Sequence, residues 1–420
     1  MKTIVWFSNC IQSNGKNKST GSWLFSMSRL LVSTGRIHLI NITNCTEKNS
    51  SSIKHRIIND HFEEYLLPIW SLEKNGLPNI DNCNKIEDLC KKLRPDLIHI
   101  WGVENYFCTL LPTLNLDIPL LLEIQGLRTP CAEVYYGDLS IKDTISCLGL
   151  REILYFLQRS IYKDKNRMKV LGDLDKIAIK QYKHISTQSQ WVRDYVKAIN
   201  NKCVIYETGM SIREEFWSTK KWEHTESRIF YCSANGPIPY KSVQTAIKAL
   251  KIVTERYPEA KLYVIGNFKD RNNRLHQPGY LTFIKKTIKN LELTNNVMFT
   301  GPLNANEIID IMHKCIGMVQ TSYVESYSLA VAEAQVVGVP SIISYAGAMP
   351  ELATDRESGL FYSPGDYVSC AAKMIELIED DKLANKLSHC AYELAHNRND
   401  NEVVLSKQLN IYNKIIDEKS

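Results

Sequence analysis

The sequence predicts an α/β protein built from two doubly wound, Rossmann-like domains, and three observations support this. The chain has 420 residues, 44% of them hydrophobic and 23% charged, which is enough for two domains that each have a full core. Apolar runs of strand length alternate with amphipathic stretches of helix length in both halves, as in parallel sheets with crossover helices. Between about 207 and 226 a polar segment interrupts this alternation.

The expected strands are short apolar runs separated by helix-length segments. In the first half they are Thr3 to Phe7, His38 to Ile42, Leu97 to Trp101 and Leu120 to Ile124. In the second half they are Ile229 to Cys232, Lys261 to Ile265, Val297 to Thr300, Ile316 to Val319 and Ser341 to Ser344. A final helix is expected from Glu402 to Lys414.

Composition excludes several classes of protein. No apolar run approaches the roughly 18 to 20 residues that a membrane-spanning helix needs, and the N-terminus reads as a first strand rather than as a signal peptide. The 12 cysteines are scattered without a Cys-x-x-Cys pair, which indicates core thiols in a reducing cytosol and no metal site. We therefore expect a cytoplasmic protein.

The net charge of +5 is uneven, because residues 1–223 hold 30 Lys and Arg against 24 Asp and Glu. This modest excess suits an anionic lipid or a lipid diphosphate better than nucleic acid, which needs denser basic stripes.

The most informative stretch runs from Glu325 to Gly347, where Glu325 and Glu333 lie eight residues apart. Ser326 or Ser328 can cap a helix that begins with an apolar run and ends at Gly338. Free amides at the start of such a helix favour a phosphate. A carboxylate in the middle of the helix, Glu333, is costly to bury unless a ligand hydroxyl or a cation meets it.

This Glu-x7-Glu spelling, followed by Gly-Val-Pro and Ala-Gly-Ala-Met-Pro-Glu, resembles the nucleotide-sugar motif of retaining glycosyltransferase family 4, in its bacterial surface-polysaccharide branch. The resemblance implies the GT-B fold, with two Rossmann-like domains facing an interdomain cleft. It implies donor-binding roles for Glu333 on the ribose, for the amides of Tyr327, Ser328 and Leu329 on the diphosphate, and a catalytic role for Glu325 beside the transferred sugar.

Further positions match the same family. Lys241 corresponds to its diphosphate-binding lysine and is expected to be both donor-binding and catalytic, Gly266 ends a strand at the nucleotide side, and Gln125 stands where many relatives have a sugar-binding His. Two departures are visible. The chain has serines where the family usually has glycines after Glu325, and Gly236 where relatives often have a second phosphate-binding Arg.

The loop that holds Gly15 and Gly21 follows the first strand and is expected on the acceptor side. It is not a Gly-x-Gly-x-x-Gly loop, and the second strand ends without an acidic residue, so a nicotinamide dinucleotide is not expected. His99, in the apolar strand of a Pro-Asp-Leu-Ile-His run, is interpreted first as a core histidine.

The resemblance places the acceptor-side domain at residues 1–208, the nucleotide-sugar domain at 209–395, and a C-terminal helix at 396–420 that crosses back to the first domain. The least matched part is 150–183, with nine Lys and Arg against four Asp and Glu. There Leu150, Ile153, Leu154, Leu157 and Ile161 recur at helical spacing. Such a stripe is either core or a face that contacts a membrane.

The function expected from these residues is retaining transfer of a sugar from a nucleotide sugar to a hydroxyl of a lipid-linked glycan, in polysaccharide biosynthesis such as that of capsule or exopolysaccharide. No cofactor and no metal are expected. The partners are a nucleotide sugar, a glycan acceptor and, peripherally, the inner face of an anionic membrane. A nucleotide-sugar epimerase and a non-catalytic nucleotide-sugar-binding subunit remain alternatives.

Overall fold

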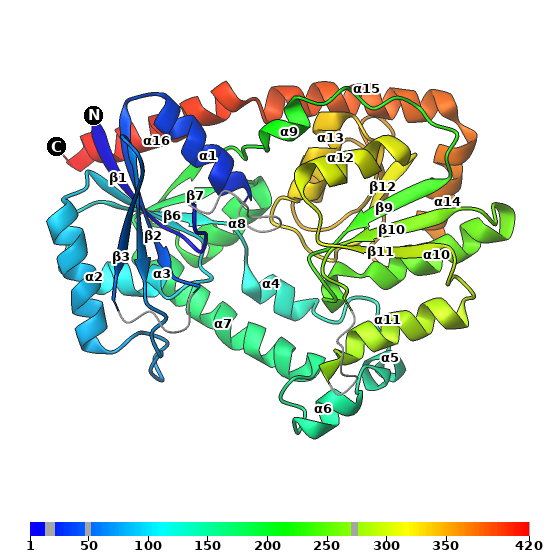
Figure 1. Ribbon diagram of the computed structural model, residues 1–420, viewed down its shortest axis with the longest axis horizontal. Coiled ribbons are helices and arrows are strands. Elements are labelled where there is room, and N and C mark those ends of the chain that lie inside the picture. The colour runs from blue at the N-terminus through cyan, green and yellow to red at the C-terminus, as the bar shows by residue number, and fades with distance from the viewer. Residues whose placement is uncertain (13–21, 47–51, 270–275, 420) are drawn as a thin grey trace. The chain divides into compact units, whose positions relative to one another are not determined.

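The structure is a computed structural model that describes residues 1–12, 22–46, 52–269 and 276–419. Its contacts divide the chain into two compact units, each an α/β unit with one sheet (Figure 1). The first unit comprises 1–127, 173–211 and 399–420, and the second comprises 128–172 and 212–398.

The first unit is built on an eight-stranded sheet with the order β3-β4-β2-β1-β5-β6-β7-β8. All neighbours are parallel except β3 and β4. The strands are β1 (Lys2–Phe7), β2 (Ile37–Asn44), β3 (Lys54–Asn59), β4 (Phe62–Leu67), β5 (Leu97–Trp101), β6 (Leu120–Ile124), β7 (His184–Thr187) and β8 (Val204–Glu207).

Helices cover both faces of this sheet, because alternate residues of its central strands point to opposite sides. Ile4 and Trp6 of β1 pack in one core cluster with residues of α1 and α16, whereas Val5 and Phe7 pack in another with α2 and α3. The helices of this unit are α1 (Ser22–Ser33), α2 (Ile80–Leu93), α3 (Phe107–Leu110), α8 (Gln190–Ile199) and α16 (Asn401–Lys419). The predicted double winding is confirmed.

The second unit has a six-stranded sheet, parallel throughout, with the order β11-β10-β9-β12-β13-β14. Its strands are β9 (Ile229–Ser233), β10 (Lys261–Ile265), β11 (Val297–Gly301), β12 (Gly317–Gln320), β13 (Ser341–Ser344) and β14 (Leu360–Tyr362). Its helices are α4 (Arg128–Glu133), α5 (Ile141–Ser146), α6 (Leu150–Leu154), α9 (Glu214–Trp217), α10 (Val243–Arg256), α11 (Gly279–Asn290), α12 (Ala305–Lys314), α13 (Leu329–Val337), α14 (Tyr367–Glu379) and α15 (Asp381–Arg398). The helix α7 (Ile161–Gln181) passes from this unit into the first.

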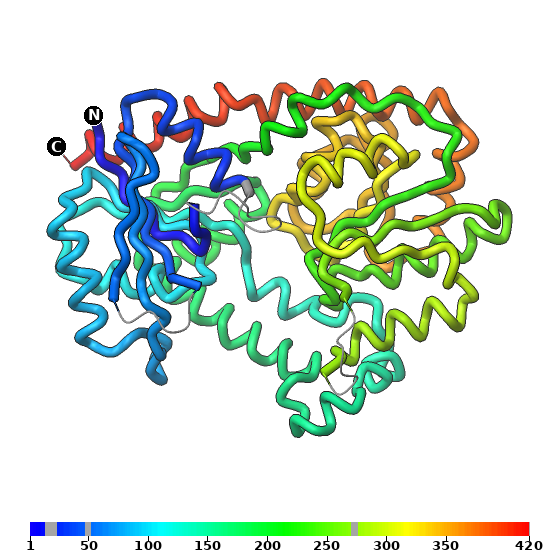
Figure 2. Tube along the Cα trace, viewed as in Figure 1, coloured from blue at the N-terminus to red at the C-terminus, as the bar shows by residue number. Residues whose placement is uncertain are grey.

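The C-terminal helix α16 belongs to the first unit, where it contacts α1 and β5. The tube in Figure 2 shows this last helix beside the first strand, with both chain ends on the same side of the unit. Tyr412 fixes it there, since its hydroxyl accepts from Trp6 Nε1 at 3.0 Å and lies 2.8 Å from Nδ1 of His99.

All nine predicted strands are present, but five others were not predicted. The hairpin of β3 and β4 is antiparallel and lies at an edge of the sheet, where side chains of β3 alternate between half-buried and exposed. β4 also carries a fully buried carboxylate, Glu64, which accepts from the Gln12 amide and from Asn41. Apolar runs alone do not reveal strands of this kind.

The segment 128–172 differs from the sequence-based division, which assigned it to the first domain. It follows β6 along the chain, yet its contacts group it with the second unit. Asp138 anchors it to the start of α10, accepting from Ser242 Oγ at 2.7 Å and from Lys248 Nζ at 2.8 Å. These partners lie more than 100 residues further along the chain, beyond the reach of local patterns.

None of the described helices is both long enough and apolar enough to span a membrane. None of the 12 cysteines, all of which lie in the described residues, forms a disulfide; nine are buried and three are partly buried, in line with their interpretation as core thiols.

Candidate active site

Lys241 and Glu325 form an ion pair in the second unit, with Nζ 2.6 Å from Oε1. The same oxygen accepts from Gln320 Nε2 at 2.9 Å and from Ser322 Oγ at 2.7 Å. The other oxygen, Oε2, accepts no hydrogen bond from the described residues. The pair is 17% and 14% exposed, so it is shielded but still reachable by a ligand.

Two loops hold this pair in place. The turn Pro239–Lys241 is joined to the segment after β12, since Thr321 Oγ1 donates to the Lys241 carbonyl at 2.7 Å. The Ala348 amide donates to the Glu325 carbonyl at 2.9 Å. Gly347 allows this approach: its φ is +55°, and a Cβ there would lie 2.3 Å from the Glu325 carbonyl oxygen. The glycine in the Ala346-Gly347-Ala348 sequence is therefore required sterically, because any side chain there would collide with the Glu325 backbone.

Helix α13 begins at Leu329, as the sequence indicated, and ends at Gly338 in the left-handed conformation. Ser328, one of the two predicted caps, is the N-cap residue, but its side chain makes no capping hydrogen bond and its φ is 82°. Its hydroxyl oxygen is buried and has no partner among the described residues. The amides of the first helical turn, from Leu329, have no carbonyl of their own helix to bond. Ser328 thus brings a spare hydroxyl to a helix end that favours anions.

Glu333 is buried in the middle of α13 and is met by a cation from its own unit. Arg213 donates to Glu333 Oε1 from Nε at 3.0 Å and from Nη2 at 2.8 Å. Burial raises the pKa of the Glu333 carboxyl, and Arg213 opposes that rise. Oε2 of Glu333 accepts no hydrogen bond from the described residues, so it remains open to a ligand hydroxyl.

Tyr327 packs at the start of the same helix and is nearly buried. Its hydroxyl accepts from Arg398 Nε at 3.2 Å, and Arg398 also donates from Nη2 to Gln335 of α13 at 2.8 Å. The side chain therefore braces the helix start, and its backbone amide is the part that the resemblance assigns to the donor.

Gly266 ends β10 with φ +141°, and a Cβ there would lie 1.6 Å from the Ala234 carbonyl oxygen. Only glycine fits where the backbone at position 266 comes this close to the Ala234 carbonyl. The steric need explains the residue without a ligand, and its donor-binding role stays a prediction.

In the first unit, Gln125 follows β6, and its Nε2 is buried without a partner among the described residues. An unpaired amide donor is consistent with a ligand, so the sugar-binding role of Gln125 also stays a prediction. Gly15 and Gly21 lie outside the described residues.

His99 is a core residue of the first unit, as interpreted from the sequence. It is fully buried between aromatic rings, 4.1 Å from Trp101 by ring centroids, and burial lowers its pKa well below the usual value. Its neighbour Glu123 is equally buried, accepts from Ser186 and Gln188, and has its pKa raised by burial to about 7.

Several residues that shape the site were not found from the sequence. Arg213 lies 120 residues before Glu333, and Asp138 lies more than 100 residues before the helix that it anchors. Gln320 and Ser322 lie within five residues of Glu325, but nothing in their spacing predicts that their side chains donate hydrogen bonds to its carboxylate. Among the described residues, no three His, Cys, Asp or Glu side chains gather as a metal site would require.

Comparisons with known proteins show what the chain is similar to. Residues 215–394 match the family model described as Glycosyl transferases group 1. N-acetyl-alpha-D-glucosaminyl L-malate synthase of Bacillus anthracis is 28% identical over 177 residues, which cover 42% of this chain and only 43% of that relative. The O-antigen chain mannosyltransferase RfbU of Salmonella typhimurium is 23% identical over 372 residues, covering 86% of this chain and 88% of the relative.

Solved structures match over the whole chain. Sucrose-phosphate synthase from Thermosynechococcus elongatus aligns with a TM-score of 0.74 at 14% identity, covering 100% of both chains. HepE of Anabaena, solved with UDP and glucose, aligns with a TM-score of 0.67 at 15% identity, covering 98% of this chain and 99% of the other. At such identities the likeness shows the fold, which is GT-B. Residues 215–394, which hold Lys241, Glu325 and Glu333, are therefore similar to the glycosyl transferases group 1.

Proposed function

We propose that the protein is a retaining glycosyltransferase that moves a sugar from a nucleotide-sugar donor to a hydroxyl of a growing glycan. Lys241 and the amides of Tyr327, Ser328 and Leu329 bind the diphosphate, Glu333 receives the ribose hydroxyls, and Glu325 lies beside the transferred sugar. Gly266 and Gln125 complete the donor site in this proposal.

The observation that carries the proposal is the pairing of each key carboxylate with a cation through one oxygen only. Glu325 is held by Lys241, and Glu333 by Arg213, while the Oε2 atom of each has no partner among the described residues. A carboxylate that is fixed in position and still has bonding capacity suits the recognition of sugar hydroxyls.

The chemistry follows from where charge develops. As the bond between sugar and phosphate loosens, negative charge grows on the diphosphate, and the Lys241 ammonium together with the first amides of α13 stabilises it. Because Glu325 already shares Lys241, the incoming diphosphate competes with a carboxylate for the same ammonium. In the proposal the acceptor attacks on the same face, and the leaving phosphate takes its proton. No metal is required for these steps.

The acceptor and location extend the proposal. RfbU is an O-antigen mannosyltransferase, and this supports a role in polysaccharide biosynthesis, such as that of capsule or exopolysaccharide, with a lipid-linked glycan as acceptor. HepE was solved with UDP and UDP-glucose, so uridine donors are the first to test. We place the protein in the cytoplasm, with peripheral contact at the inner face of the membrane.

The test is an assay of donor hydrolysis and sugar transfer over a panel of nucleotide sugars, using the wild type, Lys241→Ala and Glu333→Gln. We expect both variants to lose most turnover while remaining folded. Undiminished turnover in both would refute the site assignment. Product analysis separates the alternatives: an epimerised nucleotide sugar without acceptor would indicate an epimerase, and binding without any turnover would indicate a non-catalytic subunit.

A further inference from the structure

The segment 141–157 exposes an unusual number of large apolar side chains. Six of them are between 54% and 87% exposed and lie on α5, on α6 and in the turn that follows α6. We call this the tip surface; its members are Ile141, Ile145, Leu150, Ile153, Leu154 and Phe156. A solvated helix normally shows polar residues on its outer face, so a concentration of this kind marks an interaction site.

The opposite side of the same segment is firmly attached, so the tip surface is not an unfolded core. The Glu152 carboxylate accepts from the Gly149 amide and from the Gly279 amide at the start of α11, each at 3.0 Å. A Cβ on Gly279 would lie 1.7 Å from the Cys147 carbonyl oxygen. Both α5 and α6 therefore seat their inner faces on α11 and present their outer faces to solvent.

The turn after α6 holds its side chains outward against a local conformational preference. Phe156 and Leu157 are consecutive bulky residues with φ of 48° and 63°. Side chains of this size rarely adopt the left-handed region, and they keep it where the surroundings or a function fix it. Here the result is Phe156 at 87% exposure, the most exposed large apolar side chain among the described residues.

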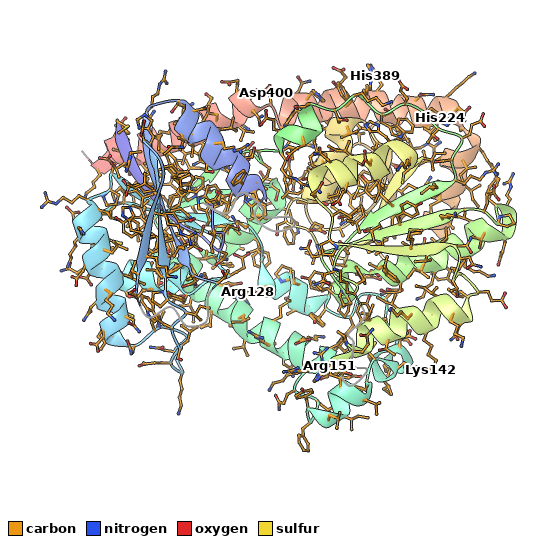
Figure 3. All side chains as sticks on the ribbon, in the orientation of Figure 1. Arg128, Lys142, Arg151, His224, His389 and Asp400 are labelled. Carbon is orange, nitrogen blue, oxygen red and sulfur yellow. The ribbon has the colours of Figure 1, made fainter. Side chains whose placement is uncertain are left out.

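Basic side chains surround the tip surface. Residues 141–169 contain seven Lys and Arg against three Asp and Glu, a net charge of +4, and one of the acidic residues is the inward-facing Glu152. Figure 3 labels two of the basic residues, Lys142 on α5 and Arg151 on α6, and shows them in the same part of the second unit. Exposed Arg159, Lys163 and Arg167 follow along the chain.

The charge decides which occupant fits. A second copy of the chain packed face to face would bring two positive surfaces together, which charge repulsion opposes. An anionic lipid bilayer offers negative headgroups to the basic side chains and acyl chains to the apolar ones. We infer that the tip surface is an interfacial docking site through which the second unit contacts an anionic membrane.

This inference rests on the proposed function and gives its membrane contact a defined surface. The exposures also show that most of the apolar stripe from Leu150 to Ile161 is not core. Leu150, Ile153, Leu154 and Leu157, the apolar stripe that could have been core, are exposed, and only Ile161 of that stripe is buried. The larger segment 128–172, which includes the tip surface, also carries Asp138, which anchors the start of α10 directly after Lys241. Docking would therefore hold the diphosphate-binding turn close to the lipid surface where a lipid-linked acceptor resides.

The test is co-sedimentation of the full chain with vesicles of phosphatidylcholine that contain about 30% phosphatidylglycerol or none. We expect binding to the anionic vesicles, with a marked decrease as salt is raised. The variant Ile153→Ser/Phe156→Ser should reduce the binding constant by about tenfold or more, because two large apolar side chains no longer enter the interface. The variant Lys142→Gln/Arg159→Gln should weaken binding to anionic vesicles selectively.

The matched control is Ile57→Ser/Val368→Ser, which also removes two exposed large apolar side chains, from β3 and α14, and should bind as the wild type does. Absence of wild-type binding, or equal binding by the tip variant, would overturn the inference. So would sedimentation velocity that shows a wild-type dimer dissociated by Ile153→Ser/Phe156→Ser, since the occupant would then be a second copy. No donor or acceptor is used, so this test and that of the proposed transfer fail independently.

Discussion

The two units differ in what surrounds their buried titratable side chains. In the first unit, His99 and Glu123 are fully buried among uncharged partners, and burial moves both pKa values toward the neutral forms. In the second unit, Glu325 and Glu333 each face a cation and keep a spare oxygen. Burial of a titratable group alone therefore does not identify a functional site. Residual exposure does so better, since Lys241 and Glu325 are 17% and 14% exposed whereas His99 and Glu123 are 0% exposed. Unused bonding capacity does not separate them, because His99 Nε2 also has no partner among the described residues.

The largest expected effect comes from removing the Lys241 ammonium, which pairs with Glu325 in the second unit. Lys241→Ala should lower kcat by about 100-fold or more, because the charge on the leaving diphosphate loses its ammonium partner. The melting temperature should also fall, since the Glu325 carboxylate is only 14% exposed and keeps Gln320 and Ser322 as partners but loses its cation. Lys251→Ala, on the following helix α10, is the control and should keep wild-type kinetics. Equal kinetics in both variants would remove Lys241 from the site.

In the first unit, the corresponding substitution is at Glu123, and it should change the free energy of unfolding and its pH dependence. The native Glu123 carboxyl keeps its proton up to about pH 7, whereas in the unfolded chain it loses the proton near 4.5. The native state binds more protons across that interval, so this group makes stability fall as pH rises from about 4.5 to 7. Glu123→Gln removes the effect and should gain stability relative to the wild type by up to about 3 kcal/mol between pH 4.5 and 8.

Urea unfolding of the two proteins at a series of pH values checks this prediction. The lowered pKa of His99 gives the opposite slope. Because His99 Nε2 lies 3.9 Å from Glu123 Oε2, the substitution also changes the surroundings of His99, so the two proteins are compared again with His99→Gln in both. A difference that is constant with pH would mean that Glu123 is ionised in the native state.

Tyr412→Phe should sharpen the comparison by weakening the first unit without touching the donor site. It removes the hydroxyl that bonds Trp6 and His99 and leaves two buried groups without a partner. We expect a loss of about 2 kcal/mol or more in unfolding free energy, with donor KM unchanged. The control is Tyr65→Phe, because the Tyr65 hydroxyl makes no hydrogen bond to a described residue. This change should leave the free energy of unfolding nearly unchanged. A raised donor KM in Tyr412→Phe would contradict the separation of roles.

The smallest effect is expected at Ser328, where strain and function compete. Ser328→Gly relieves a left-handed conformation and removes a buried hydroxyl without a described partner, so the free protein should gain about 1 kcal/mol. If the hydroxyl serves the diphosphate, donor KM should rise by about threefold to tenfold. Ser328→Ala keeps the left-handed strain and removes only the hydroxyl, so it should show the KM effect with only part of the stability gain. An unchanged KM in both variants would leave the residue with strain and no role.

The sequence predicted what local patterns can carry. Continuous apolar runs located nine strands, and the Glu325 to Gly347 spelling located α13 and both carboxylates. The same patterns missed β4, whose buried Glu64 breaks the apolar run, and β3, an edge strand with polar alternation. They also missed Arg213, because a cation that neutralises Glu333 from 120 residues away leaves no periodic signal.

The assignment of 128–172 illustrates the same limit at the scale of a domain. Chain order places this segment after β6 of the first unit, yet Asp138 and Glu152 attach it to α10 and α11 of the second. Such attachments depend on single polar contacts between distant segments. Composition nevertheless marked residues 150–183, which overlap this segment, as basic with an apolar stripe, and part of that stripe lies in the tip surface.

The most direct measurement is the thermal stability of the wild type and Lys241→Ala with and without nucleoside diphosphates. A ligand that binds the native state raises the melting temperature by mass action. We predict that at least one nucleoside diphosphate raises the melting temperature of the wild type, and that Lys241→Ala loses most of this shift, measured from its own unliganded melting temperature. No shift in the wild type for any nucleotide, or an equal shift in the variant, would contradict a diphosphate site at Lys241.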